Sequence, residues 1–273
     1  MRLIYYTILF LGIALALLVI ANHQARDHVT EIVFLDIGQG DAILIQRGTT
    51  QILVDGGPDA GVVAKLGKYM PFWDRAIEMV ILSHAHSDHY AGLIDVFDRF
   101  QVKQFVWSGA EEEAEDFEVF LEMLAAENCS VQLASKDRDF RLGEIYLDVL
   151  FPLIPDQFLD QSEENLNNTS IVIKVSSPEK SVLLTGDAEI PVEEELLRYP
   201  VYVSAEILKA GHHGSKTSSS ELFISAVDPV EVVFCAGEGN KFNHPSSQVV
   251  DRFQFLDIST ITLFESGDVT RPL

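Results

Sequence analysis

The sequence contains few cysteines and few basic residues. Its 2 cysteines, Cys129 and Cys235, form no CxxC motif, which excludes a disulfide framework and a thiolate zinc site. We expect two buried free thiols, with one isolated bridge as the alternative. Lysine and arginine number 19 against 42 aspartates and glutamates, which gives a net charge of -23. This balance excludes a broad basic surface for phosphates, so stable binding to double-stranded DNA is not expected.

The chain also lacks internal repeats and low-complexity stretches. Its 273 residues are 47% hydrophobic and 10% aromatic, which provides enough apolar side chain to fill a core. From Glu31 onward, short apolar runs follow one another densely. We therefore expect one domain over residues 31–273, preceded by a short polar linker over residues 22–30.

The N-terminal run from Leu3 to Ala21 contains no charged residue. A run of about 19 residues is long enough to cross a bilayer of roughly 30 Å as a helix, so residues 1–21 are predicted to be a transmembrane anchor. A signal peptide cleaved after Ala21 is the alternative, because Val19 and Ala21 are small residues at the positions that signal peptidase reads. Arg2 is the only basic residue ahead of the run, which favours an inside N-terminus. We expect a single-pass protein of the cell membrane with an extracytoplasmic domain, or a secreted domain.

Beyond the linker, apolar periodicity predicts alternating strands and helices. The predicted strands are Ile32–Leu35, Ala42–Ile45, Gln51–Val54, Met79–Leu82, Phe105–Trp107, Val131–Leu133, Ile145–Leu150, Ile171–Val175, Ser181–Leu184, Glu206–Leu208, Val232–Cys235 and Ile261–Phe264. The predicted helices are Gly61–Tyr69, Tyr90–Phe100, Glu113–Glu127, Pro191–Leu197, Ser218–Ala226 and Ser246–Phe255. Since the helices lie mostly between strands, this order predicts an α/β fold of sheets covered by helices.

The clearest chemical signal is the hexapeptide from His84 to His89, which has the pattern HxHxDH. It holds 3 of the 8 histidines of the chain and directly follows a predicted strand. Imidazole nitrogens and carboxylate oxygens are the ligands that zinc and similar divalent ions favour. We therefore identify His84, His86, Asp88 and His89 as candidate metal ligands.

Further candidate ligands follow other predicted strands. Asp187 comes shortly after the strand Ser181–Leu184 and is either a ligand or the N-cap of the next helix. His212 and His213 lie in a glycine turn after another strand, where we expect a ligand role for one of them. Adjacent residues leave an extended strand in opposite directions, so spacing alone leaves open which one. His244 lies in an Asn-His-Pro turn, where turn formation and a contact to substrate are both possible.

Taken together, these segments resemble the metallo-β-lactamase superfamily and, within it, the soluble domain of ComEC-type DNA-uptake proteins. The HxHxDH motif and the strand-end aspartate are typical of the superfamily. The match also includes the segments Phe34–Ala42, Val54–Gly57, Asn167–Ser170, Thr185–Asp187 and Leu208–Ser215. Among them, the DIGQGDA, NNTS and HHGS sequences are typical of the ComEC-like branch. The resemblance runs from about Glu31 to the C-terminus and implies an αββα sandwich preceded by one N-terminal hydrophobic helix.

The resemblance also implies a site for two divalent ions, expected to be zinc, with manganese possible. His84 and His86 would hold the first ion, Asp88 and His89 the second, and Asp187 would bridge them. One of the two adjacent histidines would complete the second ion. The chain departs from the family pattern, because no histidine lies between His89 and His212. This absence would leave the first ion weakly held, exchangeable or manganese.

The implied activity is hydrolysis by a metal-bound hydroxide, since no Ser-His-Asp or Cys-His arrangement stands out. Asp88, His212, His213 and His244 are the expected catalytic residues: Asp88 would orient the water, and the histidines would stabilise charged oxygens or protonate the leaving group. Further positions are expected around the ligands or the substrate, and Asp55 among them would orient the metal-binding loop. They are Asp36, Asp41, Asp55, Asn168, Ser215 and Lys216.

The ComEC-like segments favour phosphodiesters, including single-stranded DNA, as substrates. A cell-envelope ester or phosphorylcholine-type head group is the alternative substrate. A third hypothesis is that the chain is a non-catalytic binding subunit of a DNA-uptake or envelope complex. Because these residues contain a single long hydrophobic run, we expect a catalytic module that works apart from, or beside, a separate membrane channel.

Overall fold

The computed structural model describes residues 4–14, 29–154, 157–158, 165–178, 180–199 and 201–273. Residues 4–14 form a helix. Within the described ranges, no helix combines the length and the apolar character that crossing a bilayer requires. Most of the predicted anchor or signal peptide and nearly all of the predicted linker, residues 15–28, lie outside the described residues.

Two seven-stranded sheets form the centre of the domain. The first sheet has the order β16-β1-β2-β3-β5-β7-β8 and its strands are β1 (Glu31–Phe34), β2 (Ile43–Arg47), β3 (Thr50–Val54), β5 (Met79–Ile81), β7 (Gln104–Trp107), β8 (Ser130–Leu133) and β16 (Val269–Pro272). The C-terminal strand β16 pairs antiparallel with β1, so the two ends of the domain share one sheet.

The second sheet has the order β15-β14-β13-β12-β11-β10-β9. Its strands are β9 (Phe140–Leu142), β10 (Ile145–Phe151), β11 (Val172–Ser176), β12 (Ser181–Leu184), β13 (Ile207–Lys209), β14 (Glu231–Phe234) and β15 (Ser259–Thr262). The strands from β12 to β15 run parallel. A small separate pair joins β4 (Ala76–Ile77) to β6 (Gln101–Val102).

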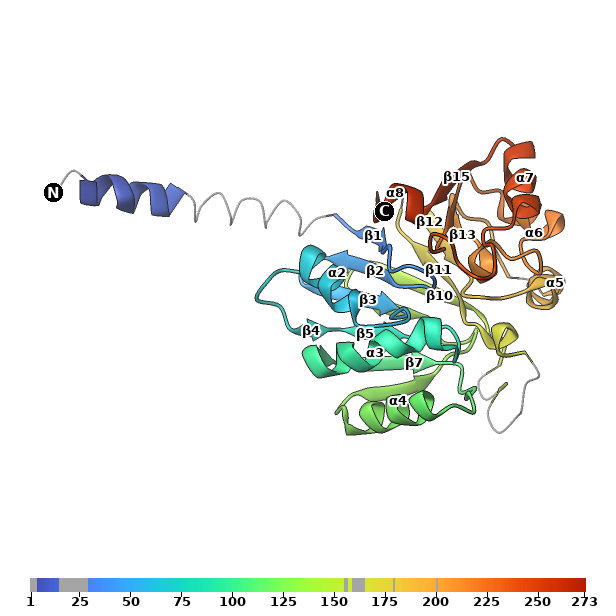
Figure 1. The fold of residues 1–273 in the computed structure, drawn as a ribbon, viewed down its shortest axis with the longest axis horizontal. Helices are drawn as coiled ribbons and strands as arrows, with labels where there is room; N and C mark the ends of the chain where they lie inside the picture. Colours follow the sequence, from blue (N-terminus) through green and yellow to red (C-terminus); the bar gives the residue numbers. More distant parts are fainter. Residues whose placement is uncertain (1–3, 15–28, 155–156, 159–164, 179, 200) are drawn as a thin grey trace.

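Helices cover the outer face of each sheet (Figure 1). The helices α2 (Gly61–Tyr69), α3 (Ser87–Arg99) and α4 (Glu115–Ala126) contribute to the core of the first sheet. The helices α5 (Ile190–Arg198), α6 (Glu221–Val227) and α7 (Ser247–Phe255) do the same for the second sheet, and the short α8 (Leu263–Ser266) follows β15.

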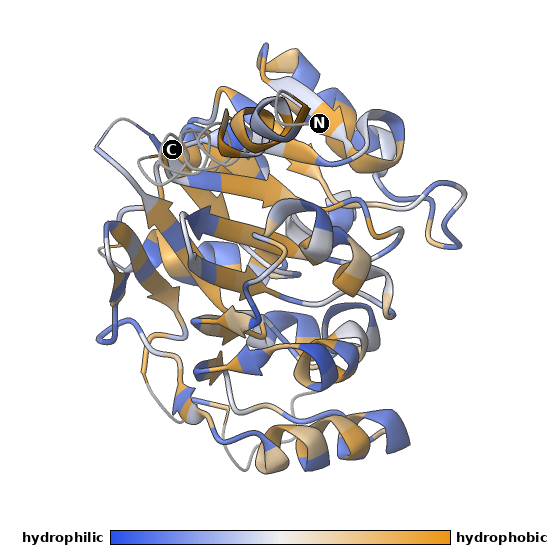
Figure 2. Cartoon of the chain, turned by 90° about the vertical axis from the view of Figure 1, so that its left-hand side faces the viewer, coloured by the Kyte–Doolittle hydropathy of each residue, from blue (hydrophilic) through white to orange (hydrophobic). Residues whose placement is uncertain are grey.

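The strand pattern produces this layering. In β2, Ile43 and Ile45 enter the core between the two sheets, whereas Leu44 enters the core under the first set of helices. Side chains of a strand alternate between its faces, so a strand that is apolar at every position supplies both cores at once. Figure 2 shows these interior strands as mostly hydrophobic. The arrangement is the αββα sandwich that the sequence predicted.

Every strand and helix predicted from Glu31 onward has a counterpart, and the differences are local. Four short strands, β4, β6, β9 and β16, were not predicted. The predicted strand Ile261–Phe264 instead ends at Thr262, where α8 begins. Both cysteines are free, as expected, but only Cys235 is fully buried and Cys129 is half-buried.

Candidate metal centre

The HxHxDH segment forms the link between β5 and α3. His86 is the residue before the helix, Asp88 lies in the first helical turn, and His84 and His89 are buried. The turn that contains Gly40, between β1 and β2, packs directly on this link. A Cβ at Gly40 would lie 2.2 Å from the backbone oxygen of Asp88. Glycine is therefore required there for the two segments to meet.

Asp187 reaches the same place from the second sheet. It follows β12 through Gly186, which has a φ of +51°, and its backbone N–H donates to the Ser170 hydroxyl at 2.9 Å. The N-cap of α5 is Glu189, so Asp187 does not cap that helix. Its side chain is free to serve the site.

His212 and His213 follow β13 in a left-handed turn rather than in an extended strand. Their φ values are 47° and 54°, a conformation that non-glycine residues seldom adopt and that is common at functional sites. The expectation that adjacent side chains point in opposite directions therefore does not apply. Both imidazoles turn toward Asp187.

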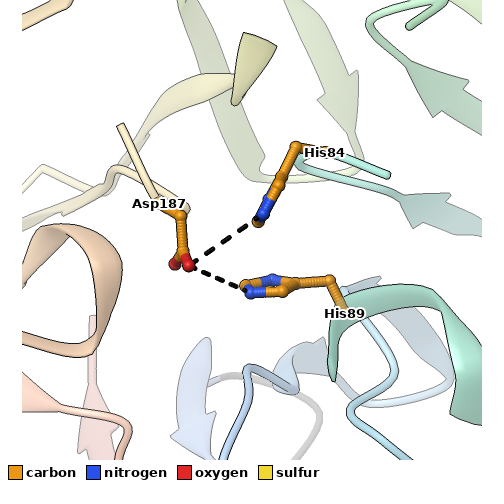
Figure 3. A group of neighbouring side chains, drawn as sticks. All are labelled: His84, His89 and Asp187. Atoms are coloured by element: carbon orange, nitrogen blue, oxygen red, sulfur yellow. Dashed lines mark ion pairs between the residues drawn. The ribbon is translucent and has the colours of Figure 1, made fainter. Parts of the chain in front are cut away.

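Four imidazole Nε2 atoms surround one oxygen of Asp187. The Oδ2 atom lies 4.0 Å from His84 and 3.5 Å from His89, as drawn in Figure 3. It lies 3.8 Å from His212 and 3.2 Å from His213. Segments more than 100 residues apart in sequence thus converge at one edge of the two sheets, as the sequence predicted.

Each of these imidazoles is held through its other nitrogen. The Nδ1 atom of His84 lies 3.1 Å from the Ser83 hydroxyl, and that of His89 lies 2.9 Å from Asp55. The Nδ1 atom of His212 lies 3.1 Å from Glu189, and that of His213 lies 2.7 Å from the backbone oxygen of Cys235. A partner at Nδ1 fixes the ring plane and leaves Nε2 available as a ligand, as in most histidine metal sites.

The spacing of these donors fits divalent ions. Two ligand atoms each about 2.1 Å from one tetrahedral ion lie about 3.4 Å apart. The distances from Asp187 Oδ2 to His89 and His213 are 3.5 and 3.2 Å, and Asp88 Oδ2 lies 3.4 Å from His213. The Nε2 atoms of His89 and His213 are buried and have no hydrogen-bond partner among the described residues. Buried nitrogen atoms of this kind need a partner, and a cation bound to their lone pairs would provide one.

A family model described as the metallo-beta-lactamase superfamily matches residues 35–238. The chain belongs to this superfamily. It is 28% identical over 260 residues to ComE operon protein 3 of Bacillus subtilis (strain 168), covering 88% of this chain and 32% of that protein. It is 30% identical over 243 residues to Competence protein ComA of Neisseria gonorrhoeae, covering 85% and 30% respectively. The predicted resemblance is confirmed, and the chain spans about a third of the length of these curated relatives.

A solved structure supports the fold independently. The metallo-beta-lactamase fold protein YhfI from Bacillus subtilis superimposes with a TM-score of 0.57 at 14% sequence identity, covering 89% of this chain and all of that one. At this identity the similarity concerns the fold alone. It agrees with the αββα layering described above.

Within this metallo-β-lactamase domain, the candidate ligands form overlapping groups that share His89. Asp88, His89 and His213 form one group, and Asp187 lies 3.2 Å from His213. His84, His89 and Asp187 form another, and the Nε2 atom of His84 lies 3.0 Å from the Nδ1 atom of His86. Because Asp88 lies 3.4 Å from His213, His213 rather than His212 is the candidate for the second predicted ion.

Opposite charges are concentrated in the buried centre. Burial alone would raise the pKa of Asp187, but the positive charge of His213, His89 and Lys209 holds it well below its usual range. Burial lowers the pKa of His213 and His89, yet Asp187 raises both well above the usual value for histidine. Asp187 therefore favours the protonated form of both imidazoles, and each must be neutral at Nε2 to act as a metal ligand.

His84 and His86 have lowered rather than raised pKa values. Burial, together with the charge of His89, lowers the pKa of His84 well below its usual value. The same two causes lower the pKa of the less buried His86. These two imidazoles are neutral at neutral pH and are ready to bind a cation.

A buried lysine supports the bridging aspartate. Lys209 is fully buried, and its ammonium lies 2.5 Å from Asp41 Oδ2 and 3.3 Å from Asp187 Oδ1. It also donates to the backbone oxygen of Gly186 at 2.6 Å. Because Lys209 holds Oδ1 of Asp187, the other oxygen is directed to the imidazoles. Lys209 lies in the LKAGHHGS segment but was not predicted as a site residue.

Two predicted residues around the ligands occupy supporting positions. Asp55 accepts hydrogen bonds from the backbone and the hydroxyl of Ser83 at 2.7 Å each, in addition to its contact with His89. This geometry agrees with its predicted role in orienting the loop. Asp41 pairs with Lys209 and lies 3.3 Å from His213 Nδ1.

Four predicted residues lie outside the immediate site. Asp36 donates its backbone N–H to Asp268, near α2. Asn168 accepts from the backbone of Glu189, Ser215 bonds Thr217, and Lys216 is exposed. The structure does not place any of these four among the residues that line the cleft described next.

The cluster opens to solvent through a cleft of about 280 Å³. Residues from both halves of the sandwich line it, namely Gln39, His86, Ser87, Asp88, Glu112, Asn167, Asp187, His212, His213, Phe242 and His244. Five of these, Gln39, Ser87, Glu112, Asn167 and Phe242, were not predicted. Asn167 is the neighbour of the predicted Asn168, and its Oδ1 atom is buried with no hydrogen-bond partner among the described residues.

Glu189 was also missed, although it organises one wall of the cleft. Its carboxylate accepts from Asn165 at 2.7 Å, from Asn167 at 3.3 Å and from Thr217 at 2.7 Å, besides holding His212. A glutamate two residues after the strand-end Asp187 was the only sequence signal for this role.

Proposed function

We propose that the chain hydrolyses phosphodiester bonds with two divalent ions and that single-stranded nucleic acid is its substrate. The observation that carries the proposal is the convergence of four imidazole Nε2 atoms within 4.0 Å of one oxygen of Asp187. Membership of the metallo-β-lactamase superfamily and the similarity to a competence protein support hydrolysis and nucleic acid, respectively.

The donor set supports two ion positions. His84, His86 and Asp187 would hold one ion, and Asp88, His89, His213 and Asp187 the other. Histidine and carboxylate donors suit zinc and also accept manganese. Asn167 and His212 border the first position, where the chain lacks the third histidine that is common in the family.

Bound divalent ions would supply the nucleophile, since they lower the pKa of water from 15.7 to about 7. The residues of the chain position the reacting groups. Asp88, held 3.4 Å from His213, is placed to accept a hydrogen bond from an attacking water and so to orient it. His212 is 24% exposed at its side chain and faces the cleft, where it can donate to a phosphate oxygen.

His244 has a more limited role than expected. Burial, with His212 as the next cause, lowers the pKa of His244 to about 4. At neutral pH it is uncharged, so it can donate a hydrogen bond to the leaving oxygen but does not serve as a strong acid there. Its Nδ1 atom has no hydrogen-bond partner among the described residues.

The charge distribution favours an extended single strand. The net charge of -23 opposes a rigid duplex that would contact much of the surface. Repulsion from distant carboxylates is screened beyond about 8 Å at physiological salt, so a thin anionic chain can still reach a cationic centre.

Metal analysis and cleavage assays test the proposal together. The full chain is purified, its metals are measured by mass spectrometry before and after chelation, and it is incubated with end-labelled single-stranded and duplex DNA in zinc or manganese. We expect about two ions per chain and cleavage of the single strand only. Asp187→Asn is the inactive control, with Asp228→Asn as an exposed carboxylate control.

Other outcomes would replace the proposal. Bound metal with cleavage of a phosphorylcholine ester but not of DNA would favour an envelope substrate. Bound metal without cleavage of either substrate or of bis(p-nitrophenyl) phosphate would favour a binding subunit.

We also propose that the domain acts outside the cytoplasm, held by or released from the N-terminal apolar run. The support is the uncharged sequence from Leu3 to Ala21 behind Arg2. Membrane fractionation with protease accessibility in intact cells tests this location, and a protected domain would contradict it.

A further inference from the structure

The loop over residues 237–246 places an exposed aromatic ring beside the metal centre. The Phe242 side chain is 53% exposed, yet it lines the same cleft as Asp88 and Asp187. Its ring stacks with the His244 imidazole, with centroids 5.6 Å apart and planes inclined by 22°. All the other residues that line the cleft are polar or charged. One apolar ring is thus presented at the mouth of a site for an anion.

The loop holds this ring in a defined position. The Asn240 side chain donates to the backbone oxygens of Gly237 and His244 at 2.9 and 2.6 Å. Its Oδ1 atom accepts from the backbone of Phe242 at 3.2 Å and of His244 at 2.9 Å. Gln39, from the first sheet, accepts from Gly237 at 3.3 Å. An exposed side chain on a loop fixed in this way is preorganised for a ligand.

A cation lies next to the ring. The Lys241 ammonium lies over the Phe242 ring, 4.8 Å from its centroid, and the Lys241 side chain is exposed. A flat ring with an adjacent lysine matches the two parts of a nucleotide, a flat base and an anionic phosphate. Aromatic side chains beside positive groups are the usual means of binding single strands.

The space around the loop suits an extended chain. His244 also lines a second cavity of about 450 Å³, formed with Asn240, Thr260 and Thr262 among others. Its only charged lining residue is Glu265. His244 thus lines both cavities, and the second one offers a neighbouring nucleotide a surface with a single carboxylate in an otherwise acidic protein.

We propose that Phe242 is a stacking platform for the base next to the cleaved phosphodiester, so that the chain recognises nucleic acid by a base as well as by its phosphate. This inference rests on the proposed function and adds a residue that determines substrate choice. A base in a duplex is covered on both faces by its neighbours, so the platform accepts unpaired bases.

Binding and cleavage of matched oligonucleotides test the platform. The full chain with manganese is given a cleavage-resistant phosphorothioate oligonucleotide and its abasic counterpart, and affinities are measured by fluorescence anisotropy. The same pair with ordinary linkages gives kcat/KM. The variants are Phe242→Ala, Phe242→Leu and Phe242→Trp, with Phe255→Ala as the control because Phe255 is 88% exposed and does not line the cleft.

We expect Phe242→Ala and Phe242→Leu to weaken binding of the base-containing strand about 5- to 150-fold and to leave the abasic strand unchanged. Phe242→Trp and Phe255→Ala should retain wild-type affinity for both. Metal content should be equal in all variants. The same base-dependent loss is expected in kcat/KM.

The proposal is overturned if Phe242→Ala affects both strands equally or neither strand. Wild-type affinity in Phe242→Leu would also overturn it, because an apolar contact would then suffice. If the wild-type chain prefers the base-containing strand but cleaves neither, the hydrolase function fails while the platform stands.

Discussion

The metal centre and the rim of its cleft are built in opposite ways. At the centre, Asp187, Lys209 and His213 are buried, and each contacts at least two other charged or polar groups. At the rim, His244 is half-buried and Phe242 is exposed, and both lie on a single loop. Under the proposed function, the centre, fixed from several sides, would determine the reaction for every substrate, and the rim, on one loop, would determine which substrate binds. Substitutions at the two regions should therefore have different effects.

The largest effect is expected at the shared aspartate. Asp187→Asn removes the charge that both ion positions share and leaves His89 and His213 without their main partner. We expect turnover of every substrate to fall to background, together with loss of bound metal in mass spectrometry. If the variant keeps its metal and activity, the centre is not at Asp187.

Loss of the buried lysine should first affect stability. Lys209→Met removes the ammonium that contacts both Asp41 and Asp187, and breaking such a buried pair costs about 3–5 kcal/mol. Urea unfolding of the metal-free chain measures this cost. The double variant Asp41→Asn with Lys209→Met should recover part of it, whereas Lys216→Met, at an exposed lysine, should have no effect.

Metal binding should depend on pH. In the metal-free chain, Asp187 raises the pKa values of His89 and His213, which favours their protonated forms. An imidazole must release its Nε2 proton to bind a cation, so the apparent affinity should rise as the pH rises. Calorimetry in two buffers of different ionisation enthalpy counts the protons released. A flat pH profile would contradict this charge assignment.

The contribution of these ion pairs to the stability of the metal-free chain should depend on pH in the opposite direction. A raised pKa in the folded state means that the ion pairs of His89 and His213 stabilise the metal-free fold fully below the unfolded pKa near 6.5. That contribution is lost as pH rises through the raised pKa values. Low pH therefore favours the metal-free fold, and higher pH favours metal binding.

The smallest effect is expected at the rim. His244→Ala removes a neutral hydrogen-bond donor, and the net value of one such bond is about 0.5–1.5 kcal/mol. We expect kcat to fall about tenfold or less, with metal content and the pH dependence of metal binding unchanged. Steady-state kinetics with single-stranded DNA measures the effect, and loss of metal would instead place His244 in the centre.

Much of the fold could be predicted because it depends on local periodicity. Strands such as β2 are apolar on both faces, and α2 has the bounds that its amphipathic pattern predicted. The strands β9 and β16 were missed because their residues are only partly buried or lie at the edge of a sheet. Pairing with a distant neighbour, rather than local preference, defines such strands.

The same distinction between local patterns and distant contacts applies to the candidate site. The sequence by itself determined the ligand types and their places at strand ends, because a motif as compact as HxHxDH permits few other uses for its side chains. Only the tertiary structure decided that His213 joins Asp88, that Asn167 rather than Asn168 faces the cleft, and that Lys209 and Phe242 belong to the site. These outcomes depend on a left-handed turn and on contacts between the two sheets. Contacts between residues far apart in the chain exist only after both sheets have packed, so no local pattern encodes them.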